Sequence, residues 1–464
     1  MATINSIGLG SSVLTADVID KLKANDVANI ITPIDNKITL QRQKGDALSL
    51  LNSLLTTFKS SASALDDDAL YQKRSVSGST TAISVTADAG VAVQSFSLTT
   101  NNMALNTIKE SGTFASTTGS VATGSGTMSL MVGTTAFNID YTSATTLDSL
   151  KESINNVAGS SVKASTLQVG DGDYRLILTS TLTGKSQTIS MSDSSGGTLS
   201  TKLLTSNPSD LDGMQEIQAG IDASFKYNGI TLERSSNEIS DLIVGAKITL
   251  LQDTGTTNIA ISQDVTAISD EMSNFVLNYN TLTSQLNDMT TSNAETGAVG
   301  IFNGDNSINS ITREINRLIT SVDSKGFSLA QFGVDLNETG VMSFNSSTFT
   351  TQFNLDSAAS EAFFSGKTTV DSNGNTSTVD GLFTSMNTLM ERYTGTNGII
   401  STLTTGSTNE LEALDTSKVR SQALLDARYA TMTARFVQYD LMMTKLTNQF
   451  SSLQQQITTA TNGG

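Results

Sequence analysis

Ten apolar side chains near the end of the chain recur at spacings that alternate strictly between four and three residues: Leu425, Tyr429, Met432, Phe436, Tyr439, Met443, Leu446, Phe450, Leu453 and Ile457. This alternation is typical of the contact positions of a coiled coil. Because no Gly or Pro lies between Ser407 and Asn462, the pattern predicts one long, uninterrupted helix. We expect such a helix to bury its apolar stripe against a partner.

The same alternation recurs in three segments earlier in the chain. They run from Leu48 to Leu65, from Val265 to Met289 and from Ile308 to Val322. Amphipathic helices of this kind usually form the core of a helical bundle. Because such seams lie near both ends of the chain, we expect the two terminal regions to pack on one another. The residues between Asp66 and Asp264 would then form an insertion.

The last part of the C-terminal seam carries no charge. From Leu446 onward, the apolar seam residues are set among Ser, Thr, Asn and Gln. Charged side chains normally keep an isolated helix soluble and select its partner. We therefore expect this segment to pack against other chains.

Between Arg74 and Asp264 the apolar period changes to two, which is typical of half-buried strands. The clearest hairpin runs from Ser224 to Glu233, where Asn228-Gly229 predicts a type I′ turn. Clusters of Gly, Ser and Thr at residues 119–127 and 192–198 indicate domain edges. We predict two small antiparallel β domains, the outer one inserted in the inner one.

The predicted fold class is therefore α+β and multidomain. It combines paired N- and C-terminal coiled-coil helices and a helical stem domain with two inserted antiparallel β-rich domains. The predicted limits are 1–42 and 430–464 for the terminal helices, 43–73 and 265–429 for the stem, 74–115 and 216–264 for the inner β domain, and 116–215 for the outer one.

The composition excludes several classes of partner. A net charge of −17 argues against nucleic acid, because neutralising phosphates requires a basic face, and it disfavours an anionic membrane surface. No stretch is long and apolar enough for membrane insertion. Met1 to Asp20 lacks the basic start and apolar run of a secretory signal, so we expect a cytoplasmic chain or one exported without a cleaved Sec signal.

We find no candidate catalytic, cofactor-binding or metal-binding residue. The chain has no His and no Cys, and no Ser lies in a nucleophile elbow. The segment Thr179–Ser186 ends like a phosphate-binding loop, but it begins with Thr where the motif requires Gly. The segment Asp371–Leu382 lacks the Gly and the final Glu that a calcium loop requires. We therefore expect neither a cofactor nor an enzymatic activity.

Several motifs point to one family. Ser6-Ile7-Gly8-Leu9-Gly10-Ser11, followed by a helix from Val18 to Leu22, resembles the start of bacterial flagellar capping proteins, also called hook-associated protein 2. Thr146 to Gly184 resembles the short repeat shared by flagellins and hook-associated proteins. One departure is Ser12, which stands where the family often has Gly.

The C-terminal region supports the same resemblance. Phe275 to Asn280, Phe332 to Asp335 and Gly340 to Phe344 are similar to the C-terminal region of the family. The order and spacing of these motifs together are specific to the family.

The resemblance implies a structural role outside the cell. The chain would be exported unfolded through the flagellar type III apparatus with an export chaperone, and would form a homo-oligomeric ring, expected as a pentamer, at the filament tip. There it would help flagellin fold and polymerise and prevent the loss of exported flagellin, with hook-filament junction proteins as further partners. The seam spacing itself is compatible with several oligomeric states.

We expect the assembly interface to combine the charge-free seam with an N-terminal patch. Its residues are Ile4, Ile7, Leu9, Phe436, Met443, Leu446, Phe450, Leu453 and Ile457. Two alternatives stay open at this point. One is an adhesin whose β domains bind host or surface glycans, although that region lacks Trp for sugar stacking. The other is a hook-filament junction protein.

Overall fold

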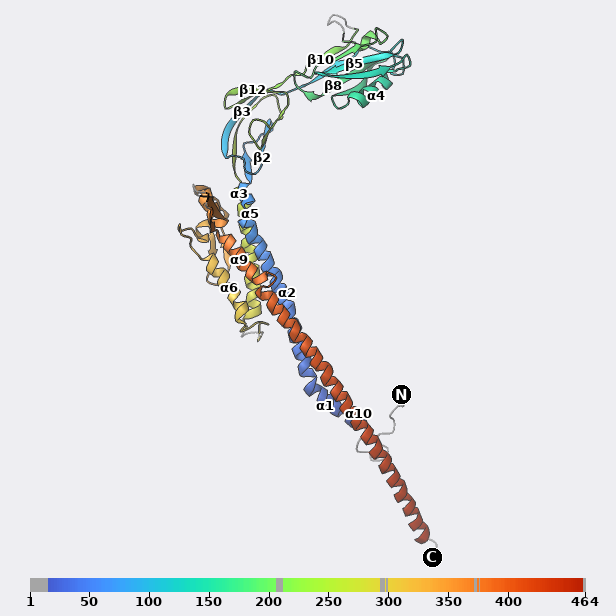
Figure 1. Cartoon of the computed structure of the whole chain (residues 1–464), viewed down its shortest axis with the longest axis vertical. Helices are drawn as coiled ribbons and strands as arrows, with labels where there is room; N and C mark the ends of the chain where they lie inside the picture. Colours follow the sequence, from blue (N-terminus) through green and yellow to red (C-terminus); the bar gives the residue numbers. More distant parts are fainter. Residues whose placement is uncertain are drawn as a thin grey trace. The chain divides into compact units, whose positions relative to one another are not determined.

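The computed structural model describes residues 16–205, 212–292, 297, 299–370, 374 and 376–461 (Figure 1). The chain divides into two compact units, which we call the helical unit and the β unit. The helical unit comprises Met1–Asp67 and Val265–Gly464, and the β unit comprises Asp68–Asp264. The predicted fold class, long terminal helices with an inserted antiparallel β region, is confirmed.

The helical unit is built around long helices from both ends of the chain. Their bounds are α1 Ala16–Ile30, α2 Thr32–Asp66, α5 Val265–Thr290, α6 Asn306–Ile319, α9 Leu382–Thr394 and α10 Ile399–Thr461. Pro33 in the first turn of α2 separates it from α1, since Pro is tolerated there and lacks an N–H for the preceding turn. Figure 1 shows α2 and the first half of α10 running side by side, and the Gln41 side chain donates to Ser407 Oγ at 2.9 Å.

The predicted inner seams form the core of this unit. All six seam residues of α2 between Leu48 and Leu65 are at most 2% exposed, and the seam residues of α5 are buried as well. Phe275 lies at the centre, with ring centroids 5.0 Å from both Phe58 and Phe383. Phe383 comes from α9, which therefore completes the bundle.

The third seam was predicted too long. α6 ends at Ile319, and Val322 lies beyond the helix with 63% of its surface exposed. Leu318 is only half-buried, and Ile319 takes the inward position instead. The reason is the turn after Thr320, where the Asp323 carboxylate accepts from the N–H groups of Lys325 and Phe327.

Smaller elements connect α6 to α9. They are the 3-10 turn η2 Leu329–Phe332, the hairpin β16 Val334–Leu336 with β17 Met342–Phe344, helices α7 Ser346–Leu355 and α8 Ser357–Phe364, and the hairpin β18 Gly366–Val370 with β19 Thr376–Asp380. The side chains of Asn345 and Asp356 cap α7 and α8, respectively. Phe332, Phe349 and Phe364 pack together beneath these elements, with centroids 4.7 to 6.1 Å apart.

The β unit begins with α3 Asp68–Gln72 and contains two buried cores. The first core lies between a five-stranded sheet of order β1-β15-β3-β11-β12 and a three-stranded sheet of order β13-β14-β2. These strands are β1 Arg74–Ser77, β2 Ile83–Ala87, β3 Gln94–Asn102, β11 Ala223–Tyr227, β12 Ile230–Arg234, β13 Glu238–Ile239, β14 Ala246–Leu250 and β15 Gly255–Gln263.

The predicted hairpin between Ser224 and Glu233 is confirmed. β11 and β12 pair with Tyr227 opposite Ile230, which leaves Asn228 and Gly229 as the two turn residues. Both have positive φ, 49° and 85°, as a type I′ turn requires.

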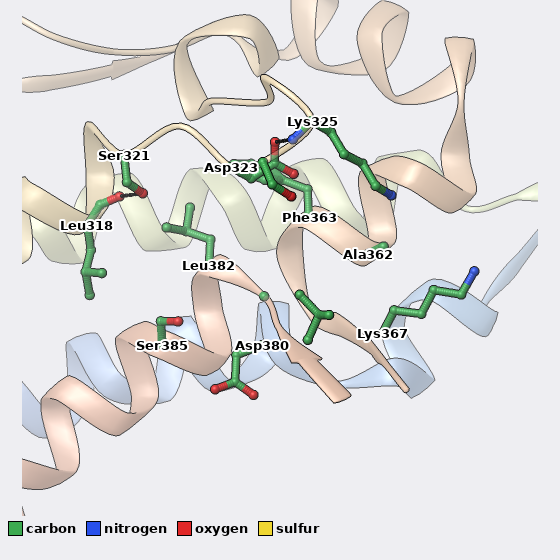
Figure 2. Close-up of a pocket in the computed structure, with 13 residues that line it drawn as sticks. Leu318, Ser321, Asp323, Lys325, Ala362, Phe363, Lys367, Asp380, Leu382 and Ser385 are labelled. Atoms are coloured by element: carbon green, nitrogen blue, oxygen red, sulfur yellow. Dashed lines mark hydrogen bonds between the residues drawn. The ribbon is translucent and has the colours of Figure 1, made fainter. Parts of the chain in front are cut away.

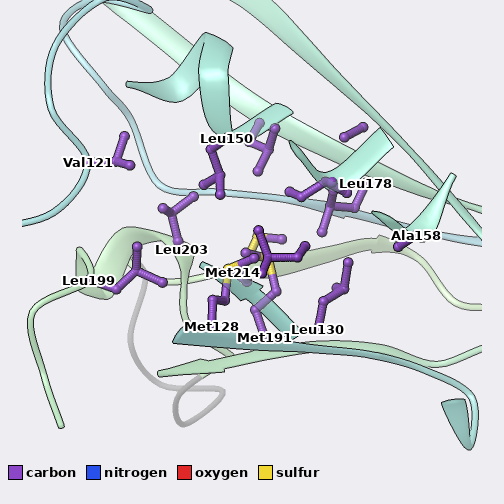
Figure 3. Close-up of a cluster of buried hydrophobic side chains, with 14 of the residues drawn as sticks. Val121, Met128, Leu130, Leu150, Ala158, Leu178, Met191, Leu199, Leu203 and Met214 are labelled. Carbon is purple, nitrogen blue, oxygen red and sulfur yellow. The ribbon is translucent and has the colours of Figure 1, made fainter. Parts of the chain in front are cut away.

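The second core lies between the sheets β10-β4-β8-β7 and β6-β5-β9, together with one helix. Met128, Met191 and Met214 meet in the middle of this core (Figure 3). The elements are β4 Asn106–Glu110, β5 Gly126–Val132, β6 Thr135–Tyr141, α4 Leu147–Ala158, β7 Val162–Gly170, β8 Asp173–Thr183, β9 Ile189–Asp193, η1 Thr201–Leu203 and β10 Gln215–Gln218.

Helix α4 was not predicted as a helix. Its buried residues Leu147, Leu150 and Ile154 have helical spacing, and Thr146 caps its first turn. β4 lies within the range predicted for the inner domain but pairs with β8. The four domain limits themselves stay a prediction.

Candidate functional site

The N-terminal helix α1 packs on α10 through a small apolar cluster. Ile19 and Ile31 are buried against Leu425 and Tyr429, each at most 5% exposed, with Met432 and other half-buried residues around them. This cluster is the paired-terminus contact that the sequence led us to expect. It ends a little beyond Tyr429 along α10.

Polar contacts fix the register of α1 on α10. The Asp26 carboxylate accepts a hydrogen bond from the Tyr429 hydroxyl at 2.8 Å and pairs with Arg428 at 3.1 Å. Burial, and then the neighbouring Asp26 carboxylate, raise the pKa of Tyr429 above its usual value. One turn away, Lys23 pairs with Asp426 at 2.8 Å. These contacts join residues about 400 positions apart, so the sequence pattern could not have found them.

Beyond this contact the seam of α10 opens to solvent. Figure 1 shows α10 continuing past α1 toward the C-terminus. Phe436 is half-buried, whereas the seam residues that follow it are 45% to 75% exposed: Tyr439, Met443, Leu446, Phe450, Leu453 and Ile457. An exposed row of large apolar side chains is unusual on a free chain and typically marks a contact surface. We call these six residues the open seam.

A groove lies along α10 where the buried and open parts of the seam meet. Its volume is about 620 Å³, and Met432, Phe436 and Tyr439 line it together with Arg428 and Arg435. Every lining residue belongs to α10 itself. The groove is therefore a helix face that other segments can cover.

The predicted assembly residues divide into two groups. Ile4, Ile7 and Leu9 lie outside the described residues, as do residues 371–373 and 375 of the calcium-loop-like segment. The second group lies on α10, where Met443, Leu446, Phe450, Leu453 and Ile457 are exposed. Because they alternate at four and three residues, the helix places them along one stripe. Their role in assembly stays a prediction.

Sequence reasoning missed two exposed residues beside this stripe. Leu441 and Met442 are 64% and 62% exposed. They fall off the four-and-three spacing, so the seam pattern passed over them. A count of apolar residues per turn would have found them, since 441–443 is a continuous apolar run.

Three features of the described residues concern the chemical motifs considered in the sequence. No group of three or more Asp or Glu residues there lies close enough together to hold a metal ion. Lys185, from the phosphate-loop-like segment, pairs with Asp222 at 3.1 Å and Glu233 at 3.2 Å. No described helix combines the length and hydropathy needed to span a bilayer.

Two family models match the chain. The flagellar hook-associated protein 2 C-terminus matches residues 220–448, and the N-terminus of the same protein matches residues 11–107. Together they cover α1, α2, α10 as far as residue 448, and the strands of the first core of the β unit.

Individual relatives agree with the family models. Flagellar hook-associated protein 2 from Campylobacter jejuni is 31% identical over 79% of this chain, and the match spans 65% of that protein, just under two thirds of its length. For Helicobacter pylori the match spans only 36% of the relative. The Escherichia coli K12 protein is 27% identical over the whole of both chains.

A solved structure shares the fold. The crystal structure of the D1-D2-D3 domains of the flagellar cap protein FliD from Escherichia coli covers 78% of this chain and 99% of its own, with a TM-score of 0.58 and 26% identity. The similarity includes both the helical and the β regions.

Proposed function

From the premise that this chain belongs to the flagellar hook-associated protein 2 family, we propose that it assembles with copies of itself into a cap. The cap would sit at the distal tip of the extracellular flagellar filament, promote the folding and polymerisation of flagellin there, and prevent the loss of exported flagellin. Its role is structural, and filament assembly and motility depend on it.

The open seam is the observation that carries this proposal. Burial of a large apolar side chain contributes about 1.5–3 kcal/mol, and residues Leu446 to Ile457 offer four such side chains that are half to three-quarters exposed. No charged residue follows Lys445, so nothing in this stretch selects a partner by charge or repels a copy of the same helix. A surface of this kind favours the packing of several identical helices around a common axis.

The finer partners are part of the proposal. We infer a ring of five copies, export through the flagellar type III apparatus with a chaperone, and a filament whose other end meets the hook-filament junction proteins. A chain without Cys suits export in an unfolded state, because no thiol can pair wrongly. Neither the adhesin nor the junction alternative is supported by the relatives from Campylobacter jejuni, Escherichia coli and Salmonella typhimurium, which carry the name flagellar hook-associated protein 2.

The division into terminal helices, stem, inner and outer β domains is proposed with the same limits as above. The separation of the two hydrophobic cores of the β unit supports two β-rich parts. In this scheme the terminal helices hold the cap together and the stem positions the β domains.

The test is complementation of a strain that lacks this gene. A chain ending at Lys445 should fold and be secreted but should not restore filament growth, because the open seam is shortened to Tyr439 and Met443. A second variant changes Leu446, Phe450, Leu453 and Ile457 to Ser and keeps the length. The matched control changes Ser451, Gln455 and Thr458, which lie off the seam, to Ala. Normal filaments from either seam variant would refute the proposal.

A further inference from the structure

A second surface of the helical unit combines a pocket with an unusually open hairpin. The pocket has a volume of about 570 Å³ and lies among the turn after α6, helix α8, the hairpin β18–β19 and the start of α9 (Figure 2). Its lining includes Leu318, Phe363, Val379 and Leu382, and also Lys325 and Lys367. None of these residues belongs to the seam on α10.

The apolar floor of the pocket is rigid. Phe363 is 5% exposed and stacks on Phe332, with centroids 5.6 Å apart and planes 8° from parallel. Leu382 is 7% exposed and begins α9. Side chains fixed in this way lose little conformational freedom when a further group packs on them, so the floor is prepared for a ligand.

The hairpin that forms one wall is not covered by the described chain. Every β18 and β19 side chain that the structure describes is exposed, and Val370 and Val379 are both 65% exposed. An isolated two-stranded hairpin is marginally stable in water, and its free strand edges can pair with other segments. Lys367 pairs with Val379 across the hairpin, and both line the pocket.

Two glycines hold the root of this hairpin in place. Gly366 has a φ of +88°, and a Cβ there would come within 2.5 Å of the Val379 carbonyl oxygen. A Cβ on Gly381 would lie 2.3 Å from the Gly366 nitrogen. The hairpin is therefore anchored next to α9 by close backbone packing, although its side chains make few contacts.

Two lysine side chains lie on one side of the pocket. Figure 2 shows the side chains of Lys325 and Lys367 extending to the same side, beside Ala362. Both residues are exposed, and neither forms an ion pair with the described parts of the chain. Asp323 and Asp380 also line the pocket, so its four charged side chains balance in total. In Figure 2 the two lysine side chains extend away from both carboxylates, and the cationic side of the pocket is therefore the side of Lys325 and Lys367.

We propose that this pocket binds an acidic surface segment of a second copy of the chain. Each copy carries a net charge of −17, so its acidic surface is attracted to a cationic site on a neighbouring copy. Lys325 and Lys367 provide this cationic site, next to the buried apolar floor of the pocket and the exposed hairpin β18–β19. The inference rests on the proposed self-assembly and adds a lateral contact between neighbouring helical units.

Photo-cross-linking of the purified full-length chain tests this contact. p-Benzoylphenylalanine replaces Val379, and isotope-labelled and unlabelled chains are mixed so that mass spectrometry separates contacts between copies from contacts within one copy. The matched control carries the same group at Val169, which is 55% exposed in the β unit. We expect mixed-label dimers from position 379 and few from position 169.

Charge reversal gives the second arm. Lys325→Glu combined with Lys367→Glu should lower the dimer yield from position 379 by about tenfold at low salt. Lys163→Glu, which reverses an exposed cation on β7, should leave that dimer yield unchanged. Circular dichroism confirms that each variant folds.

Three results would overturn the contact: adducts only within one copy, equal yields from positions 379 and 169, or no effect of the two lysine reversals. These outcomes leave the proposed cap function standing, because that function is tested separately by loss of the open seam.

Discussion

Replacing Ile19 by Ala should release α1 from α10 without unfolding the rest of the helical unit. Ile19 is 5% exposed and belongs to the cluster that also contains Ile31, Leu425 and Tyr429. This cluster is much smaller than the bundle core around Phe275. We therefore expect α1 to open locally, in advance of global unfolding.

The size of the effect follows from the burial. Truncation of a buried Ile to Ala costs about 2–5 kcal/mol, and a site at the edge of a two-helix contact belongs at the low end, about 2 kcal/mol. This corresponds to about thirtyfold faster amide exchange in α1. The matched control is Leu22→Ala on the same helix, where the side chain is 45% exposed. Surface changes of this kind stay within about 0.5 kcal/mol, or about a twofold change in exchange.

Hydrogen-deuterium exchange read by mass spectrometry provides the assay. Peptides within residues 16–30 should exchange faster in Ile19→Ala, while peptides of α5 and of α2 between Leu48 and Leu65 should keep their protection. Equal effects of the two substitutions would refute the reasoning. So would faster exchange throughout the helical unit, since α1 would then unfold only with the bundle.

Two further predictions concern pH. The pKa of Asp193 lies well below its usual range. Burial alone would raise it, but hydrogen bonds from the N–H groups of Ser195, Leu199 and Gly197 and from the Tyr141 hydroxyl outweigh that effect. The ionised carboxylate therefore stabilises the β unit above about pH 4, the unfolded value, and this stability is lost as the pH falls further. Asp193→Asn should flatten this acid dependence in denaturant titrations between pH 2 and 5. The control Asp171→Asn, at an exposed position, should leave the dependence intact. Identical stability profiles for the two variants would contradict the assignment. Burial raises the pKa of Tyr279 to about 12, against an ordinary value of 10.0. Because the folded state favours the neutral phenol, the helical unit should lose stability as the pH rises from about 10 to 12. Tyr279→Phe should remove that loss of stability. The control Tyr439→Phe, at a position that is 64% exposed, should leave it in place. A steep fall in the free energy of unfolding at alkaline pH that persists in Tyr279→Phe would refute the prediction.

The helical core could be predicted from the sequence because its signal is local and repeated. The seams of α2 and α5 hold their spacing over several turns, and their residues are buried as expected. The third seam was predicted to reach Val322, but α6 ends at Ile319 with Thr320 as its C-cap. The turn that follows is held by the Asp323 carboxylate, and apolar spacing does not reveal such a turn. The hairpin at Asn228-Gly229 was predictable because its turn requires residues that tolerate positive φ.

Contacts between distant segments could not be predicted in this way. The hydrogen bond between Asp26 and Tyr429 spans 403 positions, and neither residue belongs to a motif that names its partner. The pocket beside Lys325 and Lys367 depends on how four short elements come together. For the proposed assembly surface, spacing alone predicted the stripe from Met443 to Ile457, whereas the exposure of these side chains could be established only from the structure.

The position of the chain on an intact filament tests the central claim most directly. A small epitope inserted at Val244, a loop residue that is 93% exposed, can be labelled with gold-conjugated antibody and viewed by electron microscopy. A cap predicts gold at the free end of each filament and none elsewhere. Gold at the hook-filament junction, or along the shaft, would contradict the account.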